Sequence, residues 1–281
     1  MMKRDEILRR LNKTLAAGGA IIGAGCSAGI VAKCAELGGA DLIICYSTGK
    51  SRIMGLRTEV IGHSNPRTLD MYEEISNVVQ DTPIIAGIEA NDQTTYDLNL
   101  VIDRFVDQGF DGFINFPTVG NHEHVSDFFV REYANIAASL GQPWGFAREV
   151  ELIRRLRERD IFSMCYVFSP EQAARMAEVG VDVVCAHVGG TAGGLIGFPA
   201  DPLAEALEDA QRIMEGAWDV NPDVICLAHG GPFAEPQDTA ALYERTDAQG
   251  FVGASSIERI PIEKAVMSAV QAFKNHKIRQ R

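Results

Sequence analysis

Eight short apolar segments recur along the chain, and each ends in small or polar residues. They span Ala20–Gly25, Asp41–Ser47, Pro83–Glu89, Gly112–Pro117, Phe162–Phe168, Val181–His187, Asp223–His229 and Gly250–Ser255. Segments this apolar, without alternating polar positions, are typical of strands buried on both faces of a parallel sheet. Helical patterns separate them, such as the apolar spacing of Leu203, Ala206, Leu207 and Ala210. The eight repeats predict an α/β fold, a closed (β/α)8 TIM barrel, with residues 1–281 in a single domain.

The first residues add a helix to this pattern. Ile7, Leu8, Leu11 and Leu15 recur at helical spacing among charged residues, which indicates an amphipathic N-terminal helix and not a secretory signal. Two connections, residues 48–67 and 118–148, are longer than a plain strand–helix unit and are expected to act as lids or ligand contacts. The second is expected to contain an extra helix over residues 126–140.

A doubly wound open sheet is the alternative fold, and it commonly binds a dinucleotide at a G-x-G-x-x-G turn. The segment Gly23-Ala24-Gly25-Cys26-Ser27-Ala28-Gly29 comes close but breaks that spacing. No nucleotide cofactor is therefore expected.

Four acidic residues stand at the starts of predicted strands. Asp41, Asp111 and Asp182 each follow a helix-ending glycine by two positions, and Asp223 opens the seventh strand. In a barrel these positions lie on the bottom face, where residues serve stability. We therefore exclude them as catalytic candidates.

Composition and charge narrow the class of partner. The formal net charge of −12 excludes a general nucleic-acid or anionic-membrane surface, because such surfaces need a positive footprint. No apolar run reaches the ~20 residues of a membrane span. The six cysteines contain no C-x-x-C pair and mostly lie in apolar strands, as expected for reduced thiols in a cytoplasmic protein.

Two histidines end equivalent strands before glycine-rich turns. His187 precedes Val188-Gly189-Gly190, and His229 precedes Gly230-Gly231. At the top face a histidine can be a general acid, a general base, a metal ligand or a donor to an oxyanion. A single histidine is more often satisfied by a neighbouring carbonyl, but two at equivalent strand ends favour a functional role.

The turns after the last two strands resemble an anion site. Glycine and serine residues expose backbone N–H groups where barrels commonly hold phosphate, although glycines also simply permit tight turns. The residues expected to bind substrate at these and other strand ends are Ser27, Tyr46, Asn115, Tyr166, Gly190, Thr191, Gly231, Ser255, Ser256 and Arg259.

Carboxylates at the top face raise the question of a metal. Glu89 and Asp92 follow the third strand, and Glu258 follows the eighth. They suit Mg2+, but they could also serve as a base or pair with Arg52, Arg57 or Arg259. The string His122-Glu123-His124 looks metal-like, yet capping or solvated residues at a helix start explain it better. No lysine stands at a strand end, which argues against a Schiff-base aldolase.

Several strings together carry a family resemblance. They are Asn115-Phe116-Pro117-Thr118-Val119-Gly120, Ala186-His187-x-Gly189, Thr191 with Ile196-Gly197, His229-Gly230-Gly231-Pro232, and Gly250-Phe251-x-Gly253-Ala254-Ser255-Ser256-x-Glu258-Arg259. From about Gly18 to Phe273 the chain resembles the TIM-barrel phosphoenolpyruvate hydrolase-like family, also labelled as phosphonopyruvate hydrolases. That family includes the C-terminal domain of a plant tobamovirus-resistance protein.

The resemblance implies a function as well as a fold. Related phosphoenolpyruvate mutase and isocitrate lyase barrels hold an α-keto acid with Mg2+ on top-face carboxylates. The implied activity is hydrolysis or bond cleavage of a small anionic α-keto acid or enol, with His187 and His229 as acid–base or oxyanion residues. Asp92 and Glu89 would position metal or water.

The chain departs from the family at two places, and the resemblance carries two further implications. The chain lacks a K-K-C-G-H-type loop, and it reads Ala90-Asn91-Asp92-Gln93 where the family tends toward G-T-D-P, which keeps Asp92 and makes Glu89 less secure. Barrels of this kind often form homo-oligomers, so one is expected here. The alternative function is a ligand- or protein-binding barrel with a regulatory role and no turnover, as the plant relative indicates.

Overall fold

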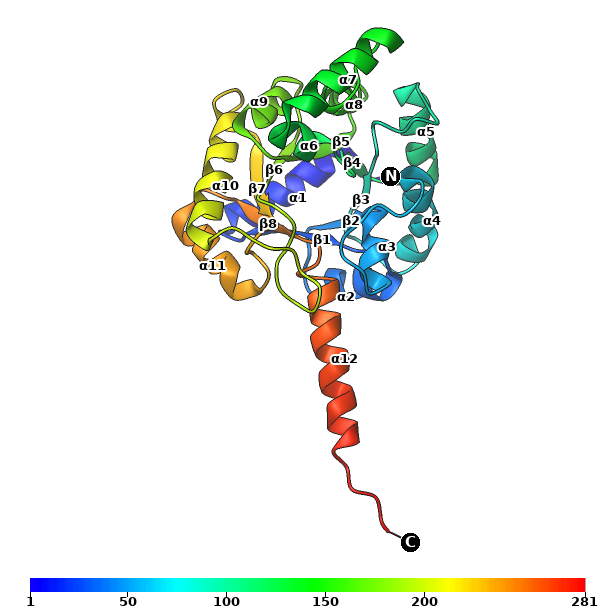
Figure 1. Cartoon of the computed structure of the whole chain (residues 1–281), viewed down its shortest axis with the longest axis vertical. Helices are drawn as coiled ribbons and strands as arrows, with labels where there is room; N and C mark the ends of the chain where they lie inside the picture. The colour runs from blue at the N-terminus through cyan, green and yellow to red at the C-terminus, as the bar shows by residue number, and fades with distance from the viewer. Residues whose placement is uncertain (281) are drawn as a thin grey trace.

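The computed structural model describes residues 1–280 and contains a closed barrel of eight parallel strands in chain order (Figure 1). The strands are β1 (Ile21–Gly25), β2 (Leu42–Cys45), β3 (Ile84–Gly87), β4 (Gly112–Ile114), β5 (Phe162–Val167), β6 (Val183–His187), β7 (Ile225–His229) and β8 (Gly250–Gly253). Pairing of β8 with β1, with Ile21 opposite Gly250, closes the barrel. The predicted TIM barrel is confirmed, and each expected segment contains its strand.

Helices cover most of the outside of this barrel. They are α1 (Arg4–Ala16), α2 (Gly29–Leu37), α3 (Thr48–Ile53), α4 (Ser64–Ser76), α5 (Leu98–Gln108), α6 (Gly120–Val125), α7 (Asp127–Leu140), α8 (Phe146–Glu158), α9 (Pro170–Glu178), α10 (Leu203–Trp218), α11 (Pro236–Arg245) and α12 (Arg259–Lys274). Among residues 1–280 no helix is long and apolar enough to cross a bilayer. The extra helix expected after the fourth strand is α7, and α3 is a helix that the sequence did not reveal.

Local signals explain where several helices begin and end. Ser169 caps α9 by accepting a hydrogen bond from the Gln172 N–H, and Pro170 follows at a position where its missing N–H costs nothing. At the end of α5, Gly109 adopts a φ of 111°, a left-handed conformation that favours glycine. The chain can therefore turn at once from α5 into β4.

Two separate cores form because every strand is buried on both faces. The outward side chains of the strands pack under the surrounding helices, and the inward ones fill the barrel. Ile7 and Leu11 of α1 are buried and join the inner core, together with inward residues such as Ile21, Leu42 and Phe162. The N-terminal helix therefore closes the bottom of the barrel, and its apolar stripe is explained by that packing.

The acidic residues excluded as catalytic are structural. The Asp41 carboxylate accepts hydrogen bonds from the Ile22 N–H and the Thr14 hydroxyl. Asp111 accepts from the Ile84 N–H, and Asp182 accepts from the Ser163 N–H and from the Arg4 guanidinium. Each carboxylate joins the start of one strand to its neighbour, which confirms the bottom-face assignment for these three.

Two helices stand apart from the barrel. None of the residues of α7 is buried, and α12 runs away from the body of the protein (Figure 1). In α12 only Arg259 and Ile260 are buried. Its exposed apolar side chains include Val266, Val270 and Phe273, and the last of these is 78% exposed.

The packing of α1 generates a stability prediction. Ile7→Ala leaves a cavity at the bottom of the barrel, and we expect it to lower the free energy of unfolding by about 2–5 kcal/mol. Arg9→Ala, on the exposed face of the same helix, should change it by no more than ~0.5 kcal/mol. Urea denaturation measures both. Equal, small effects would show that α1 does not close the inner core.

Candidate active site

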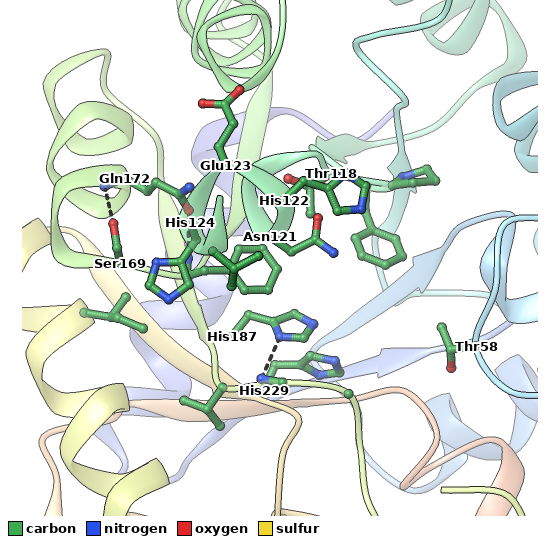
Figure 2. Close-up of a pocket in the computed structure, with 18 of the residues that line it drawn as sticks. Thr58, Thr118, Asn121, His122, Glu123, His124, Ser169, Gln172, His187 and His229 are labelled. Atoms are coloured by element: carbon green, nitrogen blue, oxygen red, sulfur yellow. Dashed lines mark hydrogen bonds between the residues drawn. The ribbon is translucent and has the colours of Figure 1, made fainter. Parts of the chain in front are cut away.

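A cavity of about 1190 Å³ opens at the carboxyl ends of the strands. Figure 2 shows His187 and His229 near its centre, with Thr58 on one side and His124 and Ser169 on the other. The site residues expected from the sequence that line this cavity are Tyr46, His187, Gly190, Thr191, His229 and Ser255. The position agrees with the rule that barrel enzymes place their sites at this end of the sheet.

The histidine pair arises directly from strand register. His187 of β6 stands opposite His229 of β7, so both side chains point into the barrel at its top. Their ring centroids are 4.6 Å apart, and the rings meet edge to face at 67°. The two imidazoles therefore form one unit, which the sequence indicated only as two equivalent strand ends.

Hydrogen bonds assign different roles to the two rings. The His229 Nδ1 lies 2.6 Å from the Val252 carbonyl, which only accepts, so this Nδ1 carries the proton and Nε2 carries the lone pair. The His187 Nδ1 accepts from the Gly189 N–H at 3.2 Å, so its proton is on Nε2 when the ring is neutral (Figure 2). The pair thus offers one donor and one acceptor.

Burial keeps both rings neutral. Loss of solvation lowers the pKa of His229 to about 4, and the positive charge of Arg52 lowers it further while the bond to Val252 opposes the shift. Burial also lowers the pKa of His187 well below the usual value, and the neighbouring His229 adds to this. At neutral pH the donor and acceptor roles are therefore fixed.

Aromatic rings form the floor beneath the histidines. Tyr166 of β5 lies 4.8 Å from the His229 ring and 5.2 Å from the His187 ring, measured between centroids. Tyr46 and Phe116 continue this layer, with their centroids 4.7 Å apart. Tyr166 is fully buried and does not line the cavity, so it supports the histidines from below.

A buried ion pair stands beside the histidines. The Glu258 carboxylate accepts from the Arg52 Nε at 2.9 Å and from the N–H and hydroxyl of Ser27 at 2.7 and 2.6 Å. The Arg52 Nη2 lies 2.9 Å from the same carboxylate. The side chains of Arg52 and Glu258 are 1% and 0% exposed. This network ties together the loops that follow β1, β2 and β8.

Arg52, which the sequence suggested only as a possible partner of the top-face carboxylates, pairs with Glu258 and is a further functional candidate. Its guanidinium lines the cavity and lies 5.4 Å from the centre of the Tyr46 ring. The Nη1 atom makes only a long contact, 3.5 Å, with the Thr58 hydroxyl, which itself lies 3.5 Å from the Ser255 hydroxyl. The Nη1 side of this fixed cation thus faces Thr58 and Ser255, which both line the cavity.

A second buried carboxylate shapes the loop after β4. Glu149 accepts from the Asn115 side chain at 2.5 Å, the Thr118 hydroxyl at 2.6 Å and the Val119 N–H at 2.7 Å. Burial raises the pKa of Glu149 to about 8, although these hydrogen bonds lower it. The Asn115 amide thus already bonds to Glu149 and to the backbone of Tyr166, and Asn115 does not line the cavity.

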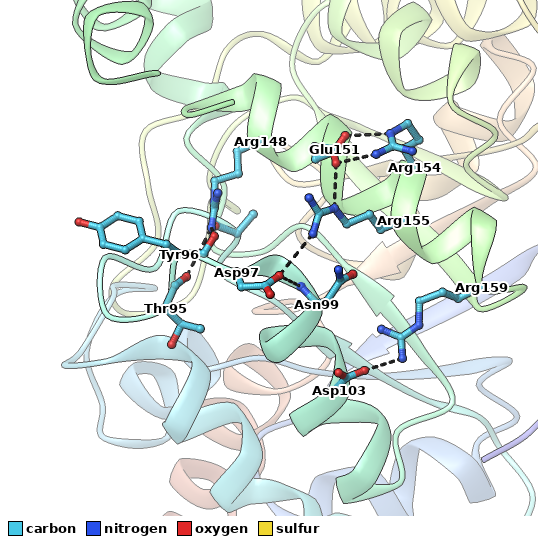
Figure 3. Close-up of polar contacts among 11 residues, drawn as sticks. Thr95, Tyr96, Asp97, Asn99, Asp103, Arg148, Glu151, Arg154, Arg155 and Arg159 are labelled. Carbon is cyan, nitrogen blue, oxygen red and sulfur yellow. Dashed lines mark hydrogen bonds and ion pairs between the residues drawn. The ribbon is translucent and has the colours of Figure 1, made fainter. Parts of the chain in front are cut away.

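The acids expected to hold a metal lie outside the cavity lining. The Asp92 carboxylate accepts from the Thr94 N–H and hydroxyl and from the Asn65 amide. Arg148, buried beside this loop, donates to the carbonyls of Ala90 and Tyr96 (Figure 3). Across residues 1–280 no group of three His, Cys, Asp or Glu side chains is placed to hold a metal ion.

Other expected substrate-binding residues serve the frame of the site. The Ser27 hydroxyl donates a hydrogen bond to Glu258, and Arg259 donates to Glu263 and to the Gly193 carbonyl. Gly231 and Ser256 also lie off the cavity lining. The residues His122, Glu123 and His124 do line the cavity. Glu123 accepts a hydrogen bond from the Phe146 N–H at the start of α8, which is a capping contact.

The pKa of His229 predicts how stability depends on pH. An unfolded histidine binds a proton near pH 6.5, whereas the folded ring binds one near pH 4. The stabilisation of the folded state by neutral His229 is therefore fully present above pH 6.5. It is lost as the pH falls toward 4, which lowers the free energy of unfolding by up to about 3 kcal/mol.

We expect His229→Asn, which places an N–H where Nδ1 stands, to weaken the dependence of the free energy of unfolding on pH between 6.5 and 4. Urea denaturation at several pH values between 7.5 and 4.5 measures it, with His276→Asn on the exposed C-terminal segment as control. An unchanged slope in His229→Asn would contradict the assignment.

Comparison with known proteins shows relatives along nearly the whole chain. A family model described as phosphoenolpyruvate hydrolase-like matches residues 6–276. The ToMV susceptible protein tm-1 of tomato (Solanum lycopersicum) is 36% identical over 286 aligned residues, and the ToMV resistance protein Tm-1 of the same plant is also 36% identical. Each match covers 98% of this chain, and the chain spans about a third of the length of these relatives, 36%.

Solved structures agree on the fold. A phosphonopyruvate hydrolase superposes with a TM-score of 0.61 at 16% identity, covering 99% of this chain and 90% of the other. A 2,3-dimethylmalate lyase of the PEP mutase/isocitrate lyase superfamily gives 0.60 at 17% identity, covering 99% and 89%. Identities this low establish the architecture alone, but the family match covers the barrel and its site. This chain belongs to the phosphoenolpyruvate hydrolase-like family.

Proposed function

We propose that this protein is an enzyme that acts on a small anionic α-keto acid or enol, by hydrolysis or by cleavage of a C–C or P–C bond. The observation that carries the proposal is the neutral histidine pair, with one Nε2–H donor and one Nε2 acceptor, beside the guanidinium of Arg52. Family membership supports the same class of chemistry.

Cleavage of such substrates needs a stabilised enolate. In our proposal the Arg52 Nη1 and the Ser255 hydroxyl bind the carboxylate, and the His187 Nε2–H donates to the 2-oxo oxygen as negative charge develops there. The His229 Nε2 lone pair accepts the proton of the attacking water or of the substrate hydroxyl. Because both rings are neutral at the start, neither role requires a prior change of charge.

A metal was expected at Asp92 and Glu89, and a related phosphonopyruvate hydrolase structure holds oxalate and Mg2+. The donor set here fits poorly. Both Asp92 oxygens already accept hydrogen bonds, and neither acid lines the cavity. Burial also raises the pKa of Glu89, which disfavours the charged form. These two acids therefore do not fit a Mg2+ site beside the histidines.

The alternative function is a barrel that binds a ligand or protein without turnover. It is supported by the tomato relatives, whose names describe virus susceptibility and resistance and no reaction. The histidine pair beside a fixed cation favours catalysis, because binding alone does not need an acceptor and a donor of defined tautomer.

A ligand screen followed by turnover measurement tests the proposal. Pyruvate, oxaloacetate, phosphoenolpyruvate and phosphonopyruvate at millimolar concentration should raise the melting temperature for at least one compound, because ligand binding stabilises the folded state. Repeating the screen with Mg2+ and with a chelator decides whether a metal is required.

With the compound that binds, we expect His187→Asn and His229→Asn to lower kcat by about 10²–10⁴-fold, since each variant loses the Nε2 atom. His276→Asn is the matched control and should behave as the wild type. Binding without turnover in the wild type would favour the alternative function. Near-normal turnover in both variants would contradict the histidine roles.

We also propose that the chain forms a homo-oligomer through α12. An isolated helix of this length is marginal in water, and Ile262, Val266, Val270 and Phe273 form an apolar stripe that must be covered. In Figure 1, α12 leaves the barrel between α2 and α11. Exposed apolar side chains on those helices, Ile30 and Leu37 of α2 and Tyr243 of α11, provide a matching surface on a second copy.

Charge placed in the stripe should separate the copies. We expect the double variant Val266→Glu/Val270→Glu to be monomeric in analytical ultracentrifugation, whereas the wild type sediments as a dimer or larger assembly. Gln271→Glu, on the opposite face of α12, adds charge without touching the stripe and should retain the wild-type assembly. A monomeric wild type would overturn the proposal.

A further inference from the structure

The cavity is much larger than a three- or four-carbon acid requires. Its volume of about 1190 Å³ exceeds the ~300–1,000 Å³ typical of sites that enclose drug-sized ligands. The groups that would bind the keto acid, Arg52, Ser255 and the two histidines, occupy its floor and one side, the side marked by Thr58 in Figure 2. The remaining space extends past the histidines toward α6, α7, α9 and α10.

The far side of the cavity is walled by apolar side chains. We call this group the apolar wall; it consists of Val125, Val130, Phe168, Pro170 and Ile213. Val125 and Val130 are 76% and 44% exposed, although they border a site that a ligand would fill. Exposed apolar surface of this kind beside a binding cavity marks a place where a ligand is expected to bury it.

Polar groups on the same side are already used within the protein. The Gln172 amide donates to the Gly120 carbonyl at 2.8 Å and accepts from the Phe168 N–H at 2.9 Å. Glu123 accepts from the Phe146 N–H, and Arg212 forms an ion pair with Asp209. Other polar residues, among them His124 and Arg175, line this side as well, and the five apolar side chains lie among them.

The wall is held in place by its own packing. The His122 ring lies 5.2 Å from the Phe129 ring, and Phe129 stacks on Tyr133 at 6.0 Å, measured between centroids. The bond from the Phe146 N–H to Glu123 joins α6 to the start of α8. The segment from α6 to α7 is thus a built side of the cavity.

We propose that the substrate carries an apolar arm of several carbons, alkyl or aryl, next to its 2-oxo acid group, and that this arm lies against Val125, Val130, Phe168, Pro170 and Ile213. This inference rests on the proposed function for the position of the acid group. It narrows the substrate class from small keto acids in general to 2-oxo acids with a substantial apolar side chain.

A chain-length series tests the inference. Binding of pyruvate, 2-oxobutanoate, 2-oxohexanoate and phenylpyruvate is measured by calorimetry on the full chain. We expect the affinity to rise about threefold to fourfold for each methylene group that becomes buried. In the double variant Val125→Asn/Val130→Asn, the ratio of phenylpyruvate affinity to pyruvate affinity should fall toward one. Val60→Asn, at the opposite side of the cavity, should keep the wild-type ratio.

A second probe separates this inference from the proposed function. The anilinonaphthalene sulfonate dye reports apolar surface without a 2-oxo acid group, and we expect the wild type to bind it and Val125→Asn/Val130→Asn to lose that binding. Equal affinity for all four acids, with no loss of dye binding in the variant, overturns the apolar arm while the keto-acid function stands. Loss of dye binding in the variant, with no affinity for any 2-oxo acid, supports the arm and refutes the keto-acid function. If the variant keeps its dye binding and no 2-oxo acid binds, the apolar arm and the keto-acid function are both overturned.

Discussion

Closure of the barrel by the pairing of β8 with β1 is the constraint on which the site depends. Once the strands form a ring, alternate residues of each strand must point to the axis, and those at the carboxyl ends meet at the top. His187 and His229 share a register position on adjacent strands, so neither can turn away without shifting a whole strand. The geometry of the histidine pair is thus a property of the sheet and not of a mobile loop.

Buried acidic side chains extend that order from the strands to the loops. Glu258 gathers the loops after three strands around one carboxylate, and Glu149 holds the loop that follows β4. Buried carboxylates with several donors are costly to disturb, because the loss of one partner leaves a charge or a donor without solvent. The top of the barrel is therefore kept in shape by polar contacts, whereas the bottom is closed by the apolar side chains of α1.

Much of this arrangement was predictable from sequence because strands buried on both faces leave long apolar runs. Those runs located the eight strands and, through their last residues, His187 and His229. The sequence suggested Arg52 only as a partner of a top-face carboxylate, because it lies on α3, within a polar stretch that has no apolar periodicity of its own. Glu89 and Asp92 looked central because they follow β3 closely, but that strand ends at Gly87 and the chain then turns toward Asn65. A list of strand ends does not reveal which way the chain leaves the sheet.

The fixed tautomers of the two histidines have a consequence for the stereochemistry of a product formed in the cavity. Arg52, His187 and His229 stand on different elements around the barrel, and their order around the ring follows from chain order. In the proposed reaction, three distinct attachment points would present a planar ligand with only one of its two faces toward the His229 Nε2. A reaction at this site that creates a new stereocentre should give a single enantiomer, and its configuration is determined by the direction in which the strands run around the barrel.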